Sequence, residues 1–71
     1  MTTQDKALTL YKESLLSDRV QDDLNSGCSP DDDSFIQGVF DQVYSLLSKT
    51  FTEEEMDEIE IGDVLDDTHF S

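Results

Sequence analysis

The sequence predicts an all-α fold, a small bundle of three or four short helices. Apolar residues recur at helical spacing in several segments, residues that favour helix starts precede those segments, and no segment has the alternation of a β-strand. Leu, Ile, Val and Phe make up 19 of the 71 residues, which exceeds the level of roughly 20 per cent below which a highly charged chain is disordered. We therefore expect residues 1–71 to form one small helical domain in which residues 63–71 are flexible.

The first predicted helix covers residues 4–16. Thr2 or Thr3 can cap it, and Asp5 lies near its positive end, where a carboxylate favours the helix dipole. Its apolar residues share one face at helical spacing, and they are Ala7, Leu8, Tyr11, Leu15 and Leu16.

The stretch after residue 16 either continues this helix or begins a second one with Ser17 as its cap. Val20 and Leu24 lie four residues apart and therefore share a helix face. In both cases residues 25–27, Asn-Ser-Gly, end the helix, because asparagine and glycine tolerate left-handed backbone angles.

The strongest helix signal spans residues 30–49. Ser29 is the predicted cap, Pro30 supplies a first helical residue with a fixed φ, and residues 31–33, all aspartates, suit the positive end of the helix. The apolar stripe that follows is too broad for one short helix to cover, so we expect it at the centre of the core and, in a homodimer, at the dimer contact. The stripe consists of Phe35, Ile36, Val39, Phe40, Val43, Tyr44, Leu46 and Leu47.

The segment that begins at Phe51 carries both halves of a helix start. Thr52 and Glu55 fit a capping box, while Phe51 and Met56 fit a hydrophobic staple. We expect this helix to begin sharply at Glu53 and to dock weakly, because it carries few apolar side chains.

Beyond this helix the pattern weakens. Gly62 interrupts it, Asp63 can cap one further turn through Val64 and Leu65, and residues 66–71 are expected to fray. The acidic C-terminus is therefore predicted to be partly frayed.

Negative charge is concentrated at the C-terminal end. The chain carries 18 Asp and Glu against four Lys and Arg, a formal charge of −14. Nine of the carboxylates and none of the bases lie in residues 51–71. Such a field repels nucleic acid and anionic lipid and attracts basic protein surfaces. We therefore expect a basic protein partner, and neither direct nucleic-acid binding nor membrane binding.

The spacing of these carboxylates favours a mimic of nucleic acid. If residues 53–67 were one helix, its length of about 22 Å would carry roughly one charge per 2.5 Å. Duplex DNA carries about one charge per 1.7 Å when both strands are counted and about one per 3.4 Å on a single strand. We interpret the protein as an inhibitor that presents carboxylates to the nucleic-acid-binding surface of a partner, in the manner of a virus-encoded anti-defence protein. The expected partner-binding residues are Glu53, Glu54, Glu55, Asp57, Glu58, Glu60, Asp63, Asp66, Asp67, Asp31, Asp32 and Asp33.

An alternative function uses the apolar stripe instead of the charge. In that interpretation the protein is a regulatory adaptor or an antitoxin that binds another protein through Phe35, Phe40 and Tyr44. The acidic residues would then serve only solubility.

A third interpretation rests on residues 33–35, Asp-Ser-Phe, at the start of the apolar helix of a short, acidic, helical chain. This segment resembles the Asp-Ser-Leu motif of acyl carrier proteins, and residues 61–65 resemble the start of that family's last helix. The resemblance implies that Ser34 would take a phosphopantetheine arm. The Leu-Gly pair that precedes the motif in that family is replaced here by residues 29–32, Ser-Pro-Asp-Asp.

Catalysis and metal binding have little support in the sequence. Cys28 and His69 are the one thiol and the one imidazole. They lie in a predicted loop and a predicted frayed end, which hold a base poorly within the roughly 3 Å that proton transfer needs. Residues 22–27 fail the spacing of a calcium loop. We expect no enzyme activity, no cofactor and no dedicated metal site.

Cysteine usage and hydropathy bear on localisation. A single cysteine cannot form an internal disulfide, which fits a reducing compartment. No apolar run approaches the roughly 18 residues of a membrane span, and the N-terminus lacks the pattern of a secretory signal. We therefore expect a cytoplasmic protein, in the host cytoplasm if its source is a virus.

Overall fold

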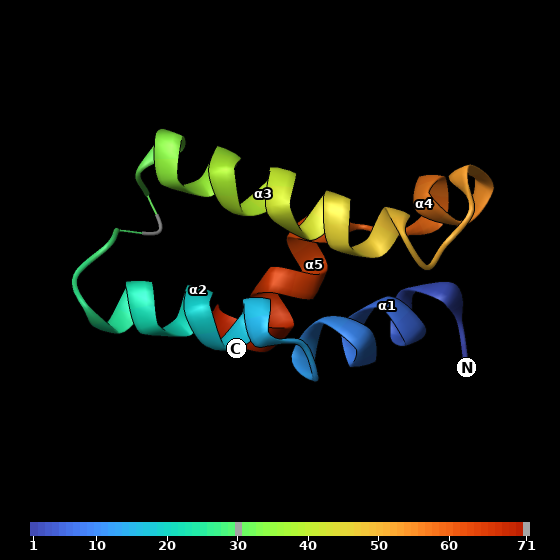
Figure 1. The fold of residues 1–71 in the computed structure, drawn as a ribbon, viewed down its shortest axis with the longest axis horizontal. Helices are drawn as coiled ribbons and strands as arrows, with labels where there is room; N and C mark the ends of the chain where they lie inside the picture. The colour runs from blue at the N-terminus through green and yellow to red at the C-terminus, as the bar shows by residue number, and fades with distance from the viewer. Residues whose placement is uncertain (30, 71) are drawn as a thin grey trace.

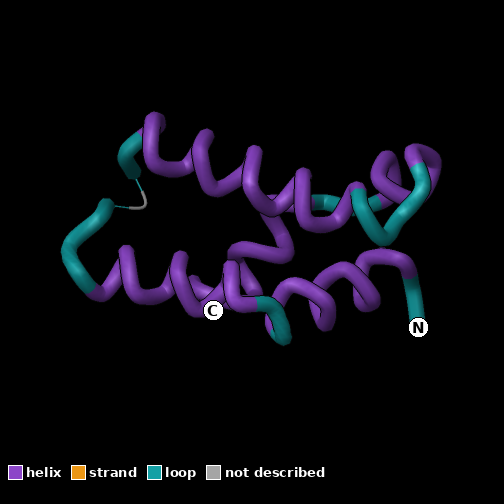
Figure 2. Tube along the Cα trace, viewed as in Figure 1, coloured by secondary structure: helices purple, strands orange, loops and turns teal. Residues whose placement is uncertain are grey.

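In the computed structural model, which describes residues 1–29 and 31–70, the chain folds into five α-helices and a final π-helical turn (Figure 1). Figure 2 shows helices and loops and no strand in this part of the chain, so the predicted all-α bundle is confirmed. α1 and α2 follow one another along one side, α3 runs back along the other, and α5 lies between them (Figure 1). The elements are α1 Thr3–Lys12, α2 Leu15–Asn25, α3 Asp33–Ser48, α4 Glu53–Glu58, α5 Ile61–Leu65 and η1 Asp66–Phe70.

α1 begins and α2 ends as the sequence predicts. The hydroxyl of Thr2 accepts from the backbone N–H of Asp5 at 3.1 Å, and the Asp5 carboxylate accepts from the backbone N–H of Thr2 at 3.4 Å. These two bonds form a capping box. At the other end α2 stops at Asn25, and Gly27 follows with a φ of 110° that glycine adopts without strain.

The predicted helix over residues 4–16 is wrong at its end, because a break at Ser14 divides this region into α1 and α2. Ser14 has extended backbone angles; its hydroxyl accepts from the backbone N–H of Ser17 and donates to the carbonyl of Tyr11 at 2.6 Å. Ser17, the cap in one of the two predicted alternatives, is buried and donates to the carbonyls of Lys12 and Ser14. Ser14 is the cap because its side chain bonds the end of one helix and the start of the next.

α3 begins three residues later than predicted. Asp32 and not Ser29 is the cap, and its carboxylate accepts from the backbone N–H of Ser34 at 3.0 Å. Ser29 instead accepts from the N–H of Asp31 at 3.2 Å, within the preceding turn. A carboxylate brings charge as well as a hydrogen bond to the positive end of a helix, which favours Asp32 over a hydroxyl. The predicted role of Pro30 lies outside the described residues.

The capping box at the start of α4 is confirmed. The hydroxyl of Thr52 accepts from the N–H of Glu55 at 3.2 Å, and the Glu55 carboxylate accepts from the N–H of Thr52 at 3.0 Å. α4 begins at the predicted residue but is short, because Ile59 takes an extended conformation with ψ 126°. The carboxylates of residues 53–67 therefore do not form one continuous helical row.

α5 differs from its prediction in two respects. Gly62 lies inside the helix and does not interrupt it. The cap position is occupied by Glu60, whose side chain makes no capping bond, whereas the sequence favours Asp63. The residues expected to fray form the turn η1, which continues directly from α5. Flexibility of residues 63–71 stays a prediction, and Ser71 lies outside the described part of the chain.

The core lies where α3 meets α1, α4 and α5. The buried residues of α3 are Val39, Val43 and Leu47, and they belong to one apolar cluster with residues of α1 and α5. α4 is attached through Met56 and Ile59, both buried, which leaves the rest of its short surface in water. The buried apolar residues are Ala7, Tyr11, Val20, Val39, Val43, Leu47, Met56, Ile59, Val64 and Leu65.

Candidate functional site

The carboxylates expected to bind a partner fall into three groups along the fold. All are exposed except Glu55, which is half-buried in its capping box. The first group, on α4 and the turn after it, contains Glu53, Glu54, Glu55, Asp57, Glu58 and Glu60; the second, on α5 and η1, contains Asp63, Asp66 and Asp67; the third, at the start of α3, contains Asp31, Asp32 and Asp33.

The third group lies apart from the first. α3 has 16 residues and is therefore about 24 Å long, and α4 follows its far end (Figure 1). Asp32 is already engaged as the cap of α3. The fold therefore places Asp31 to Asp33 at the opposite end of α3 from α4, while Asp66 lines a hollow with Ile36 and Phe40 in the first half of α3.

The turn between α4 and α5 is fixed by Gln4. Its side-chain nitrogen donates to the carbonyl of Glu60 at 3.1 Å, and its side-chain oxygen accepts from the N–H of Glu60 at 2.7 Å. Beside it, the hydroxyl of Thr3 donates to the Glu58 carboxylate at 3.2 Å. The start of α1 therefore holds the end of the acidic helix. No sequence pattern signals these contacts, because the partners are 55 and 56 residues apart.

The capping role of the half-buried Glu55 affects its ionisation. Its pKa is lowered from the usual value by the hydrogen bond from the Thr52 backbone, then by that from the Thr52 side chain, and also by the charge of Lys6. Glu55 therefore acts as a structural cap in its ionised form, whereas the remaining α4 carboxylates are exposed to solvent.

The apolar stripe of α3 divides between the core and two outer surfaces. Phe35 and Phe40 are five residues apart, about 140° around a helix, so they face different sides. Phe35 lines a cavity against α2, whereas Phe40 lines a hollow against α5 and η1. Tyr44, one turn beyond Phe40, stays 53% exposed. The three residues predicted to grip a partner together do not form one continuous contact surface.

A hollow of about 210 Å³ lies between α3 and the segment formed by α5 and η1; we name it the C-terminal hollow. Asp66 is its one charged lining residue among the described residues. A Cβ atom placed on Gly62 would have nothing within 4 Å, so the wall is open at this position. The lining residues are Ile36, Phe40, Gly62, Leu65, Asp66 and Phe70.

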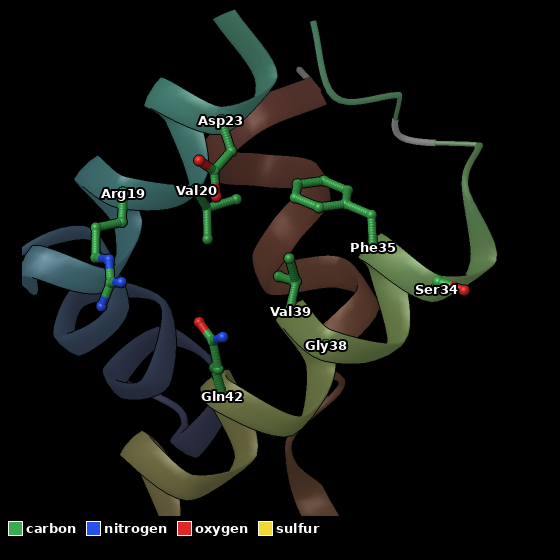
Figure 3. A pocket seen from close by; sticks show the side chains of 8 residues that line it. All are labelled: Arg19, Val20, Asp23, Ser34, Phe35, Gly38, Val39 and Gln42. Atoms are coloured by element: carbon green, nitrogen blue, oxygen red, sulfur yellow. The ribbon is translucent and has the colours of Figure 1, made fainter. Parts of the chain in front are cut away.

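On the other side of α3 a cavity of about 220 Å³ separates α3 from α2 (Figure 3). A wider depression of about 360 Å³ shares Arg19 and Gln42 with it and extends to Lys49; we name the two together the α2–α3 seam. Ser34 lies at the margin of the cavity, is exposed, and points away from Val39 and Phe35 (Figure 3). The cavity is lined by Arg19, Val20, Asp23, Ser34, Phe35, Gly38, Val39 and Gln42.

His69 is the centre of a network that ties η1 to α1 and α2. The Tyr11 hydroxyl lies 2.7 Å from Nε2 of His69, and Oε1 of Gln21 lies 2.9 Å from Nδ1. An amide oxygen can only accept, so Nδ1 carries the proton and Nε2 accepts from the Tyr11 hydroxyl. Burial lowers the pKa of His69 and raises the pKa of Tyr11 to about 12. Both rings are therefore uncharged at neutral pH, as this pattern of bonds requires.

The same network bears on catalysis. Both ring nitrogens of His69 are engaged by Tyr11 and Gln21, while Cys28 is exposed in the loop after α2. The arrangement makes His69 a structural residue rather than a base beside a thiol. In residues 1–29 and 31–70, no group of three or more His, Cys, Asp or Glu could hold a metal ion. The expected lack of enzyme activity stays a prediction.

Comparisons with protein-family models, with curated proteins and with solved structures found no match to this chain. Function is therefore inferred from the residues themselves. None of the helices in the described part of the chain combines the length and the apolar character needed to cross a membrane.

Proposed function

We propose that this protein is a small acidic binding module that inhibits a partner protein by presenting carboxylates to the basic surface with which the partner binds nucleic acid. The observation that carries the proposal is the exposure of the α4, α5 and η1 carboxylates in a segment, residues 51–71, that holds no lysine or arginine. The overall charge of −14 adds a long-range attraction toward such a surface.

Preorganisation of the C-terminal carboxylates supports this proposal. α4 starts at a capping box, its end is held by Gln4, and its two apolar side chains, Met56 and Ile59, are buried. Charges held in place before binding lose less conformational entropy than charges on a disordered tail. A defined inhibitory surface therefore fits the fold better than an acidic tail that serves only solubility.

The expected partner is a nucleic-acid-binding protein in the cytoplasm, such as a host defence protein if the source is a virus. Association between opposite fields is fast and depends steeply on salt. A complex of this kind should therefore form readily at low ionic strength and loosen when the charges are screened.

The test is a capture experiment from host lysate with the whole chain as bait, repeated at about 0.1 M and about 1 M salt, where the Debye length falls from about 10 Å to about 3 Å. We expect a captured nucleic-acid-binding protein that is released by high salt and by added duplex DNA or RNA. A partner held equally well under both conditions and in the presence of nucleic acid would overturn the proposal.

A matched pair of triple variants locates the charge that matters. Glu53→Gln, Glu54→Gln and Asp57→Asn together neutralise three exposed α4 carboxylates. The control replaces the exposed α2 residues Asp18, Asp22 and Asp23 by asparagine and makes the same change in net charge. We expect the α4 variant to lose more affinity for the captured partner. Equal losses would show that only net charge acts.

The adaptor function is a second candidate, favoured by the 53% exposure of Tyr44. Under this proposal the affinity for the partner is insensitive to salt, and Tyr44→Ser weakens binding without unfolding the protein. An affinity that falls with salt and is unchanged in Tyr44→Ser would exclude the adaptor function.

The carrier function is favoured by the position of Ser34, exposed in the first turn of α3 and pointing away from the cavity (Figure 3). Co-expression with a phosphopantetheinyl transferase tests it by mass. Under this proposal the protein gains the mass of the arm and Ser34→Ala does not. An unchanged mass of the original protein would exclude this function.

A further inference from the structure

We propose that the C-terminal hollow receives an apolar anchor of the partner, supplied by a basic segment in which one aromatic or large aliphatic side chain is flanked by lysines or arginines. This inference rests on the proposed function and adds to it the place of contact and the chemistry of the recognised segment.

The first argument is the shape of the hollow. Its volume of about 210 Å³ is below the roughly 300–1,000 Å³ of pockets that take a drug-sized ligand. That space suits one large side chain and is too small for a whole helix. Phe40 of α3 and Leu65 of α5 contribute apolar walls from two elements, so a side chain that enters is covered from both sides.

The second argument is the exposed apolar surface around the hollow. Phe70 lines it and is 44% exposed, and Tyr44, 53% exposed, follows the lining residue Phe40 by one helical turn. Exposed aromatic side chains beside an apolar depression are typical of protein-binding sites, where aromatic anchors carry much of the binding energy.

The third argument is the charge, which selects the class of partner. Asp66 belongs to the lining and Asp63 is exposed in the adjoining helix. Three of the four bases of the chain line other depressions, and they are Lys6, Arg19 and Lys49. An apolar anchor on an acidic segment would be repelled here, whereas flanking lysines or arginines meet charge of the opposite sign.

The test uses two short lysine-rich peptides that differ at one central position, phenylalanine in the probe and serine in the control. Affinities are measured by titration calorimetry on the full chain at low and at high salt. We expect the phenylalanine peptide to bind about tenfold more tightly, as burial of one aromatic side chain implies. Both peptides should weaken as salt rises.

Two glycines supply matched variants for the protein. Gly62→Leu places a side chain in the open wall of the hollow, and Gly38→Leu places the same side chain in the cavity on the opposite side of α3. Both positions have no heavy atom within 4 Å of an added Cβ, and helical circular dichroism verifies that each variant is folded. We expect Gly62→Leu to reduce the affinity of the phenylalanine peptide to that of the serine peptide and Gly38→Leu to leave it unchanged.

The outcomes separate this inference from the proposed function. Equal, salt-sensitive binding of the two peptides, unaffected by Gly62→Leu, would overturn the anchor and leave the acidic surface intact. Binding of neither peptide at low salt would contradict both. Asp66→Asn gives an independent check, because it should weaken both peptides at low salt and preserve the preference for phenylalanine. Loss of that preference in Asp66→Asn would count against an apolar site.

Discussion

The depressions on the two sides of α3 differ in the charge of their lining residues, although α3 forms a wall of each. On the side of α2, the seam is lined by Arg19 and Lys49 as well as by Asp23 and Asp41, so both signs are present. On the side of α5 and η1, the lining of the C-terminal hollow is apolar apart from Asp66. Net charge alone therefore does not describe the surface of this protein. The whole chain is acidic, but the apolar depression with charge of one sign lies on one side of α3.

The two sides are also coupled. η1 supplies Asp66 and Phe70 to the hollow, and its His69 bonds Tyr11 of α1 and Gln21 of α2. η1 is therefore held in place by Tyr11 of α1 and by Gln21 of α2, the helix that lines the seam on the other side of α3. Variants of the shared core, of this network and of the two glycines test how far the two sides of α3 depend on each other.

The largest effect is expected from truncation of a side chain in the shared core. Leu47 is fully buried on α3, and Leu47→Ala should cost about 2–5 kcal/mol, comparable to the roughly 3–5 kcal/mol available to so small a domain. Urea unfolding followed by circular dichroism should show a largely unfolded protein, with both sides lost together. Leu15→Ala, at a site 81% exposed, is the control and should change stability by less than about 0.5 kcal/mol. A stable Leu47→Ala protein would contradict a single core.

The second-largest effect should appear in η1 more than in α3. Tyr11→Phe leaves Nε2 of His69 without its hydroxyl partner, at a cost of about 1–3 kcal/mol. Hydrogen exchange should become faster in residues 66–70 than in α3, because the network holds η1. Tyr44→Phe removes the hydroxyl of an exposed tyrosine and serves as the control. Uniform acceleration in both segments would show that the network does not act locally.

The stability of the fold should depend on pH through His69. Burial lowers its pKa below the usual 6.5, so the folded state binds this proton less tightly than the unfolded chain. The stability linked to His69 is therefore complete above about pH 6.5 and is lost as the pH falls from there toward the lower pKa of the folded state. Urea unfolding at about pH 7.5 and about pH 5.5 should show a smaller drop for His69→Gln, which shares every carboxylate with the original protein. Identical pH profiles for the two proteins would count against this role.

The smallest effect compares one glycine on each side. Gly38→Ala, within a helix of 16 residues, should stabilise the protein by up to about 1 kcal/mol, because alanine favours helix more than glycine does. Gly62→Ala lies near the start of a five-residue helix and should stabilise it by less. Thermal unfolding midpoints measure both changes. Destabilisation by either alanine would reveal close packing where open space is expected.

Local patterns predicted the helices well and their junctions less well. The capping box of Thr52 and Glu55 and the end of α2 before Gly27 follow from short-range chemistry, and both are present. The sequence left open whether the first helix continues or restarts with Ser17 as its cap, and the observed cap is Ser14, because several serines lie close together and each can cap. The cap of α3 was misassigned for the same reason, since Ser29 and Asp32 both suit that position.

The candidate surfaces were less accessible to sequence reasoning. The acidic composition of residues 51–71 was evident, but the separation of Phe35 from Phe40 depends on which helices flank α3. Gln4 and His69 were missed as structural residues because their partners are 48 to 58 residues away. His69 follows two aspartates and a threonine, so no local pattern signalled its structural role.

Composition and contacts within about four residues were enough to predict the helical class, a first helix capped by Thr2 or Thr3, the helix start at Thr52 and the concentration of carboxylates near the C-terminus. Packing of the whole chain sets the bonds of η1 to α1 and α2, the separation of Asp31 to Asp33 from α4, and the place of Phe40 and Phe70 in one hollow with Asp66. These arrangements arise when distant helices bury their apolar faces together, a choice that depends on the packing of the whole chain.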